Sequence, residues 1–295
     1  MIRMIGTAIA GAALSTSMAF ADWQPLVSTE DLTEILPDEP IILDIRSPGA
    51  YAEGHIEGAV SVPYNAWRGP EDNPGALISD EKLTAILTEA GVEPDVPVII
   101  SYAGKGTLDF GSAARVYWSL KSAGIQEIAI LNGGLAAWTA SGGVLTTEEG
   151  SNFASDYAYS FSEEWQIDRA GVHAVIDGTS EAQLVDARPD AFFSGAKQHA
   201  DATWAGTLRG ASNLVHEAWF GGSLLSTDKD HVLALLAKNG IAPDTQIVSF
   251  CNTGHWAATN WFVLSEIAGI KGVRLYPESM VGWTQNAKRV AKLAN

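Results

Sequence analysis

Short apolar runs alternate along the chain with longer stretches in which apolar residues recur at helical spacing. Leu43, Ile99 and Ile130 lie in runs of strand length, whereas residues 80–90 and 113–123 have the periodicity of helices. Strands that alternate with helices are typical of α/β domains with a mainly parallel sheet. The pattern therefore predicts parallel sheets flanked by helices, with ligands bound beyond the C-terminal ends of the strands.

The same series of motifs occurs twice. The first copy reads IILDIR at 41–46, GHIEGA at 54–59, VIISYA at 98–103 and LNGGLAAW at 131–138. The second copy reads QLVDAR at 183–188, GTLRGA at 206–211, QIVSFC at 246–251 and YPESMVGW at 276–283. We therefore expect two domains of one fold, at residues 22–145 and 165–295, joined by a polar linker at 146–164. Their junction is expected to lie near residue 251, because clefts between domains are common ligand sites.

The chain contains one cysteine, Cys251, which excludes a disulfide within the chain. Cys251 follows an apolar strand-like run and precedes a helix-like stretch, so it faces the free N–H groups of a first helical turn. Such a position favours an anion and would hold the sulfur as a thiolate or a persulfide. Aligning the two copies puts Ala103 at the position of Cys251. If Cys251 is the nucleophile, only the second domain is catalytic; the alternative is a buried cysteine that fills the core.

These motifs, with the cysteine in the second copy only, resemble the rhodanese family, specifically the tandem two-domain sulfurtransferases. The resemblance implies two rhodanese-like domains, of which the first is non-catalytic. It also implies that Cys251 takes sulfane sulfur from thiosulfate or a similar donor and passes it to cyanide or a thiol. The substrate-binding residues are expected to be those of the following loop: Asn252, Thr253, Gly254, His255 and Trp256. This chemistry needs no metal and no organic cofactor.

Two alternatives remain within this hypothesis. The donor could be 3-mercaptopyruvate, or the protein could be a persulfide carrier that hands sulfur to a thiol protein without turnover on small donors. A phosphatase of the Cys-x5-Arg type is disfavoured, because residue 257 is Ala257 and the phosphate-binding guanidinium is missing.

The choice of donor depends on the loop and its surroundings. In this family thiosulfate-selective members carry Arg or Lys in the second half of the loop, which here holds His255 and Trp256. We expect His255 to supply partial positive charge or a hydrogen bond, and Trp256 to line the pocket. The alternative is that Trp256 packs on the helix and His255 points to water. Thiosulfate-using relatives also carry an arginine four residues beyond Arg188, where this chain has Phe192; Arg188 itself is expected to pair with an acid.

The N-terminal 21 residues predict an export signal, with Arg3 as a positive n-region, an apolar stretch and a small-residue cleavage site ending at Ala21. A membrane anchor is the alternative, but the apolar run is short for a span. We therefore expect a periplasmic or secreted protein without a membrane span once the signal is removed. The net charge of −17 disfavours nucleic acid as a partner. The expected partners are a small sulfur donor and a cyanide or thiol acceptor, including a thiol protein.

Overall fold

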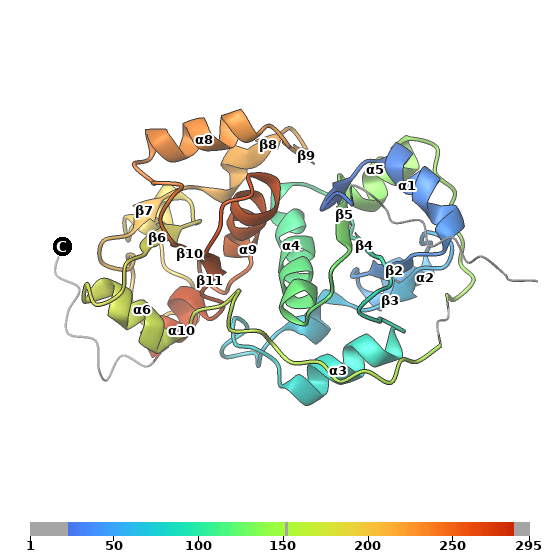
Figure 1. Ribbon diagram of the computed structural model, residues 1–295, viewed down its shortest axis with the longest axis horizontal. Helices are drawn as coiled ribbons and strands as arrows, with labels where there is room; N and C mark the ends of the chain where they lie inside the picture. The colour runs from blue at the N-terminus through green and yellow to red at the C-terminus, as the bar shows by residue number, and fades with distance from the viewer. Residues whose placement is uncertain (1–22, 151–152, 286–295) are drawn as a thin grey trace, which may run out of the picture.

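The computed structural model describes residues 23–150 and 153–285. The predicted export signal at residues 1–21 therefore lies outside the described residues. The described chain forms two halves, each built on its own parallel sheet, and they meet along α4 (Thr107–Ser122) and α9 (Trp256–Phe262) (Figure 1). The predicted α/β class is confirmed.

The first half contains a five-stranded parallel sheet in the order β1-β5-β4-β2-β3. Its strands are β1 (Leu26–Val27), β2 (Ile41–Asp44), β3 (Val60–Ser61), β4 (Val98–Ser101) and β5 (Ile128–Leu131). Its other helices are α1 (Thr29–Ile35), η1 (Leu36–Asp38), α2 (Pro48–Ala52), η2 (Tyr64–Trp67), α3 (Asp80–Glu89) and α5 (Gly134–Ala140). The helix expected at 80–90 corresponds to α3, and that at 113–123 to α4, which begins earlier, at Thr107.

Both faces of the first sheet are covered because successive strand residues point to opposite sides. Ile42 and Ile99 pack in one apolar cluster with side chains of α1, α2 and α5. Their neighbours Leu43 and Ile100 pack in another cluster with side chains of α3 and α4. This double coverage explains why the strands read as continuous apolar runs.

The second half contains a four-stranded parallel sheet in the order β11-β10-β6-β7. Its strands are β6 (Gln183–Asp186), β7 (Ser212–Asn213), β10 (Ile247–Phe250) and β11 (Val273–Leu275), with an antiparallel hairpin of β8 (Phe220–Gly221) and β9 (Leu224–Leu225). Its other helices are α6 (Arg169–Ile176), α7 (Asp190–Phe193), η3 (His216–Trp219), α8 (Lys229–Lys238), the π-helical η4 (Val263–Ile267) and α10 (Ser279–Gln285).

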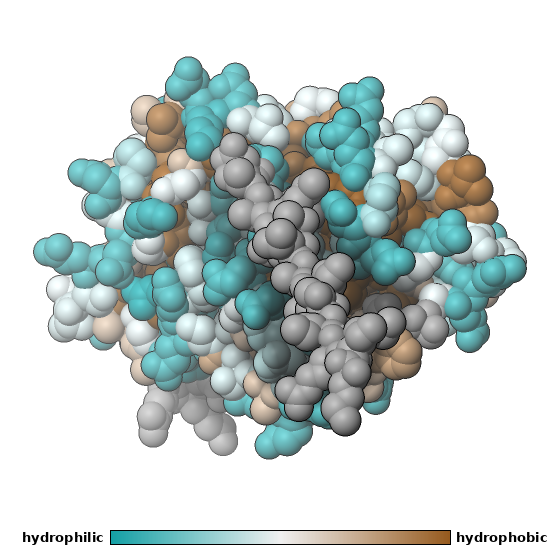
Figure 2. Space-filling model, turned by 45° about the vertical axis from the view of Figure 1, so that its right-hand side comes forward, coloured by the Kyte–Doolittle hydropathy of each residue, from teal (hydrophilic) through white to brown (hydrophobic). Residues whose placement is uncertain are grey.

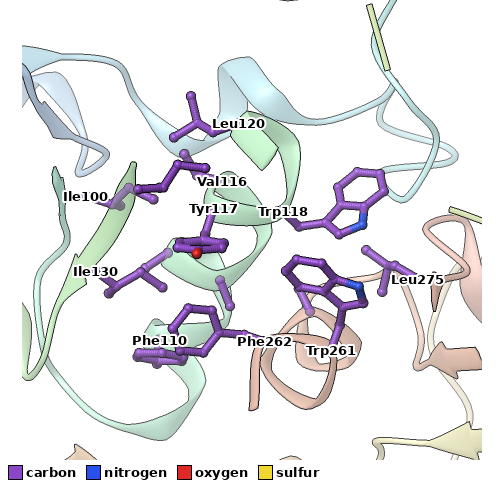
Figure 3. Close-up of a cluster of buried hydrophobic side chains, with 14 of the residues drawn as sticks. Ile100, Phe110, Val116, Tyr117, Trp118, Leu120, Ile130, Trp261, Phe262 and Leu275 are labelled. Atoms are coloured by element: carbon purple, nitrogen blue, oxygen red, sulfur yellow. The ribbon is translucent and has the colours of Figure 1, made fainter. Parts of the chain in front are cut away.

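One apolar cluster crosses the boundary between the halves (Figure 3). The ring of Phe262, on α9, lies 4.9 Å from that of Tyr117 and 5.6 Å from that of Phe110, both on α4. An ion pair of Lys121 with Glu266, at 2.7 Å, ties the far end of α4 to η4. The two halves therefore share a core, and their relative position is set by packed side chains.

The segment expected to link the domains contains no helix or strand among its described residues. It follows α3 along the outside of the first half (Figure 1), where Tyr159 is buried and its hydroxyl donates to the carbonyl oxygen of Val92 at 2.7 Å. The face in Figure 2 is mostly polar, with apolar side chains scattered over it. Within residues 23–150 and 153–285, every helix is too short or too polar to cross a membrane.

Candidate functional site: the Cys251 loop

Cys251 directly follows β10, a strand hydrogen-bonded on both sides, to β6 and β11. It lies at the C-terminal edge of the second sheet, where the sequence predicted a ligand site. The residue is 1% exposed. The thiol is therefore almost fully buried, next to the loop of residues 252–256.

The carbonyl oxygens at the start of this loop face α10. The backbone N–H of Met280 donates to the carbonyl oxygen of Cys251 at 3.0 Å, and that of Val281 donates to the carbonyl oxygen of Asn252 at 2.9 Å. These donors belong to the first turn of α10, whose N–H groups have no partners within the helix. The helix therefore holds the strand-to-loop junction from outside.

The next two carbonyl oxygens face the first domain. Arg68 Nη2 donates to the carbonyl oxygen of Thr253 at 2.6 Å, and Arg115 Nη1 donates to that of Gly254 at 3.3 Å. All four carbonyl oxygens from residue 251 to residue 254 thus have donors outside the loop. The N–H groups of the loop are therefore the backbone groups left to bind a ligand. The contacts of Arg68 and Arg115 also confirm that the loop lies at the domain junction.

Ser279 accepts hydrogen bonds from two of those N–H groups. Its Oγ accepts from the backbone N–H of Cys251 at 2.9 Å and from that of Gly254 at 3.1 Å, and it donates to the carbonyl oxygen of Tyr276 at 2.9 Å. Within the described part of the chain, the N–H groups of residues 252, 253, 255 and 256 have no acceptor. These four amides can bind an anionic sulfur atom, as backbone nests do.

Gly254 is required by the geometry of the loop. Its φ is +70°, and a Cβ atom at this position would overlap Arg115 Nη1 and the carbonyl oxygen of Pro277. A side chain would therefore strain the backbone and displace the interdomain arginine at once.

Arg188 pairs with an acidic side chain, as the sequence predicted. Its guanidinium binds Asp186 at 2.7 Å, and both side chains are almost fully buried. Arg188 Nη1 also donates to Asn252 Oδ1 at 3.3 Å. The first domain repeats the pair, with Arg46 bound to Asp44 at 2.6 Å. Arg188 therefore orients the loop and is not a free cation for a donor.

His255 does not match the expectation of positive charge. Its Nε2 lies 2.7 Å from the carbonyl oxygen of Leu108, which can only accept, so Nε2 carries the hydrogen. Its Nδ1 lies 2.9 Å from the hydroxyl of Tyr64, which donates to it. Burial lowers the pKa of His255 to about 4, and nearby Arg68 adds to this effect. The imidazole is therefore neutral near pH 7, and it is bonded to the first domain instead of pointing to water.

Trp256 forms part of an aromatic wall with Phe192 and His216. The indole stacks on His216 at 4.9 Å between ring centroids, and Phe192 meets it edge-on at 6.0 Å. Burial lowers the pKa of His216, so this wall is uncharged near neutral pH. Trp256 Nε1 is buried without a partner in the described residues, and it could donate to a ligand. Contact of His255 and Trp256 with substrate stays a prediction.

Sequence reasoning missed the contribution of the first domain to the loop, made by Tyr64, Arg68 and Arg115. Arg68 precedes Thr253 by 185 residues, so no local motif joins them. One signal was present: Arg115 lies inside the apolar stretch 113–118 of α4, and a charge in such a place indicates a buried partner.

A cavity of about 1040 Å³ lies at the corresponding edge of the first sheet. It is lined by Ala103, at the position of the missing thiol, and by Lys105 and Thr107. Tyr64 and the loop residue His255 also line this cavity, so the Cys251 loop borders it through His255. Among the described residues, no group of three or more His, Cys, Asp or Glu side chains is placed to hold a metal ion.

A family model described as a rhodanese-like domain matches residues 28–141 and 171–286. The chain therefore belongs to the rhodanese family, as a tandem two-domain sulfurtransferase.

Individual relatives cover nearly the whole chain. A thiosulfate sulfurtransferase of Pseudomonas aeruginosa is 28% identical over 266 residues, which is 90% of this chain and 95% of the relative. The sulfur carrier protein TtuD of Thermus thermophilus is 26% identical, with the same coverage of both chains. Among solved structures, SseA of Escherichia coli, described as a 3-mercaptopyruvate sulfotransferase with the rhodanese fold, superposes with a TM-score of 0.75. The sequence identity is 27%, and the superposition covers 87% of this chain and 98% of the SseA chain.

Proposed function

We propose that this sulfurtransferase moves sulfane sulfur from thiosulfate to cyanide or a thiol acceptor through a persulfide on Cys251. The observation that carries the proposal is the orientation of the loop around that cysteine. The carbonyl oxygens of residues 251–254 are bound from outside, and four N–H groups find no acceptor among the residues that the structure describes. Such a loop stabilises a negative sulfur atom.

The chemistry takes two displacement steps. The Cys251 thiolate attacks the outer sulfur of thiosulfate, the sulfur–sulfur bond of the donor breaks, and sulfite leaves with the electron pair. Cyanide then attacks the terminal sulfur of the persulfide, which releases thiocyanate and restores the thiolate. Each step needs one substrate only, so ping-pong kinetics are expected. The first domain has Ala103 at the corresponding position and contributes no second thiol.

The aromatic wall supports 3-mercaptopyruvate as a second candidate donor. Phe192 and Trp256 place uncharged surface beside the loop, which suits a donor with less charge than the thiosulfate dianion. A carrier function is the third candidate, in which the persulfide passes directly to a thiol protein.

Steady-state rates with thiosulfate and with 3-mercaptopyruvate, each against cyanide and a dithiol, test these candidates. Mass spectrometry of the donor-treated protein should show the gain of one sulfur atom on Cys251. The Cys251→Ser variant should form no adduct and transfer no sulfur. Turnover in that variant would refute the single-site mechanism. Adduct formation without turnover on any small acceptor would favour the carrier.

We also propose that the protein is exported, with cleavage after Ala21. The support is the charge and hydropathy pattern of residues 1–21. N-terminal sequencing of the protein purified from its native cells should begin at Asp22. A chain that retains Met1 and fractionates with the cytoplasm would refute export.

A further inference from the structure

Two arginines of the first domain lie side by side against the loop of the second. Arg68 follows η2 and Arg115 lies within α4. Besides the loop carbonyl, Arg115 Nη2 binds the carbonyl oxygen of Gly75 at 3.1 Å. Each guanidinium also lies over an aromatic ring, Arg68 at 5.3 Å from Tyr64 and Arg115 at 5.0 Å from Trp118.

Neither arginine has a carboxylate partner in the described part of the chain. Arg115 is 1% exposed. Its Nε and Arg68 Nη1 are buried and have no acceptor within residues 23–150 and 153–285. Burial and the neighbouring Arg68 lower the pKa of Arg115 to about 9, so it remains charged near neutral pH, and the negative form of Cys251 stabilises that charge. Buried charges are normally paired. The groups whose negative forms would act on Arg115 are Tyr64 and Cys251. Burial raises the pKa of Tyr64, which therefore stays neutral near pH 7 and leaves Cys251 as the group to supply the counter-charge.

We propose that Arg68 and Arg115 are the anion-recognition residues of the Cys251 site. They supply, from the first, non-catalytic domain, the positive charge that the loop lacks. They also position the N–H groups of the loop by binding the carbonyl oxygens of Thr253 and Gly254. The inference rests on the proposed function only for the identity of the anion, a sulfur oxyanion donor. It gives the first domain a chemical role although it has no thiol.

A purely structural role, in which the two arginines only join the domains, makes a different prediction. Lys121 provides the matched comparison, because it is also a cation on α4 and binds Glu266 across the same interface. Lys121 does not contact the loop. Lys121→Gln therefore removes one positive charge and one interdomain contact while the surroundings of Cys251 stay intact.

The test compares the rates at which iodoacetate and iodoacetamide alkylate Cys251 in the full protein at one pH. The two reagents differ in charge, and in both cases the thiolate displaces iodide. The rate with the anionic iodoacetate is divided by the rate with the neutral iodoacetamide, and the result is divided by the same ratio for a small free thiol. A high value of this ratio reports positive charge at the sulfur. We expect this ratio to fall about five-fold in Arg115→Gln and in Arg68→Gln. It should stay near the wild-type value in Lys121→Gln, and Arg68→Lys should retain most of it.

Circular dichroism and thermal unfolding show which variants are folded. If Arg115→Gln does not fold, the test is made with Arg68→Gln alone, because Arg68 is only partly buried. An unchanged ratio in the arginine variants, or an equal fall in Lys121→Gln, would overturn the proposal. The outcome is independent of turnover. A protein with the predicted reagent preference that transfers no sulfur would refute the proposed function alone, and one that transfers sulfur without the preference would refute this inference alone.

Discussion

The hydroxyl oxygen of Ser279 accepts the backbone N–H of Cys251 at 2.9 Å. Ser279 holds this position at a φ of +52°, in the left-handed region that favours glycine. The corresponding residue of the first copy is Gly134, with a φ of +57°. The same backbone turn therefore has a glycine in the first domain and a serine beside the thiol in the second. The second domain tolerates the backbone strain at Ser279 because the hydroxyl binds the Cys251 loop.

The variant Ser279→Gly separates the hydroxyl from the backbone strain. We expect sulfur transfer to fall about ten-fold or more, because two loop N–H groups lose their acceptor and the loop loses its orientation. Relief of strain should offset part of the lost stability. Ser279→Ala is the matched control: it should lose the same activity but be about 1 kcal/mol less stable than the glycine variant. Full activity in Ser279→Gly would contradict this role.

The bonds of His255 predict how stability depends on pH. Its folded pKa is about 4, below the value of about 6.5 in an unfolded chain. As the pH falls from about 6.5 toward 4, the unfolded chain therefore takes up a proton that the folded protein does not. The free energy of unfolding should fall in this window, by roughly 1–2 kcal/mol for this residue, and His216 acts in the same direction.

Urea denaturation at pH 7 and at pH 5 measures this dependence. His255→Gln should be less stable at pH 7 and should lose less stability on acidification than the wild type. His231→Gln replaces an exposed histidine away from the loop and should keep the wild-type dependence. The explanation fails if the two variants behave alike.

The neutral state of His255 also predicts the pH dependence of activity. Between about pH 5.5 and 8 a free imidazole titrates, but this one stays uncharged. The pH profile of kcat/KM for thiosulfate should therefore keep its shape in His255→Ala. The value of kcat/KM should be lower at every pH, because the contact with Tyr64 is lost. A profile that flattens in the variant would restore the charged role expected from the sequence.

Gly111 allows α4 to approach the loop. A Cβ atom there would lie 2.7 Å from Nε2 of His255 and 3.1 Å from its carbonyl oxygen. Gly111→Ala should therefore push the domains apart at the site, with a loss of about 1–3 kcal/mol and reduced sulfur transfer. Gly49→Ala, in a first helical turn with open space around it, should change stability by less than about 0.5 kcal/mol. Equal stability of the two variants in thermal unfolding would contradict the close approach.

Features that depend on nearby residues could be predicted from the sequence. The strand, loop and helix around Cys251 are contiguous, and Arg188 lies two residues from its partner Asp186. The duplication predicted two domains, since the order of motifs is visible without any knowledge of packing. These features depend on local periodicity and spacing, which a single sequence carries.

The interdomain features could not be predicted, because the contact between α4 and α9 depends on the fit of two finished domains. His255 shows the limit: its position on the loop suggested a donor-binding charge, but Tyr64 and Leu108 bind both ring nitrogens. The positive charge comes instead from Arg68 and Arg115, far upstream in the chain. Their role depends on the angle between the domains.

Phe192 offers a way to change the donor preference. Its ring lies 6.0 Å from that of Trp256 and 6.0 Å from the guanidinium carbon of Arg188, so a side chain at this position reaches the wall beside the loop. Phe192→Arg would add a charge there, and the existing guanidinium of Arg188 would repel it little because Asp186 neutralises it. Charge-assisted contacts are stronger than neutral ones. We therefore expect the KM for thiosulfate to fall several-fold, and that for 3-mercaptopyruvate to change less.

The matched control is Phe192→Leu, which removes the ring without adding charge. It should leave the KM for thiosulfate unchanged or raise it, because no new contact with the dianion forms. Steady-state kinetics at low and at high salt separate charge from shape, since screening should weaken the gain in Phe192→Arg and leave Phe192→Leu unaffected. If both variants lower the KM equally, the ring blocks access to Cys251, and the missing charge at residue 192 does not limit thiosulfate binding.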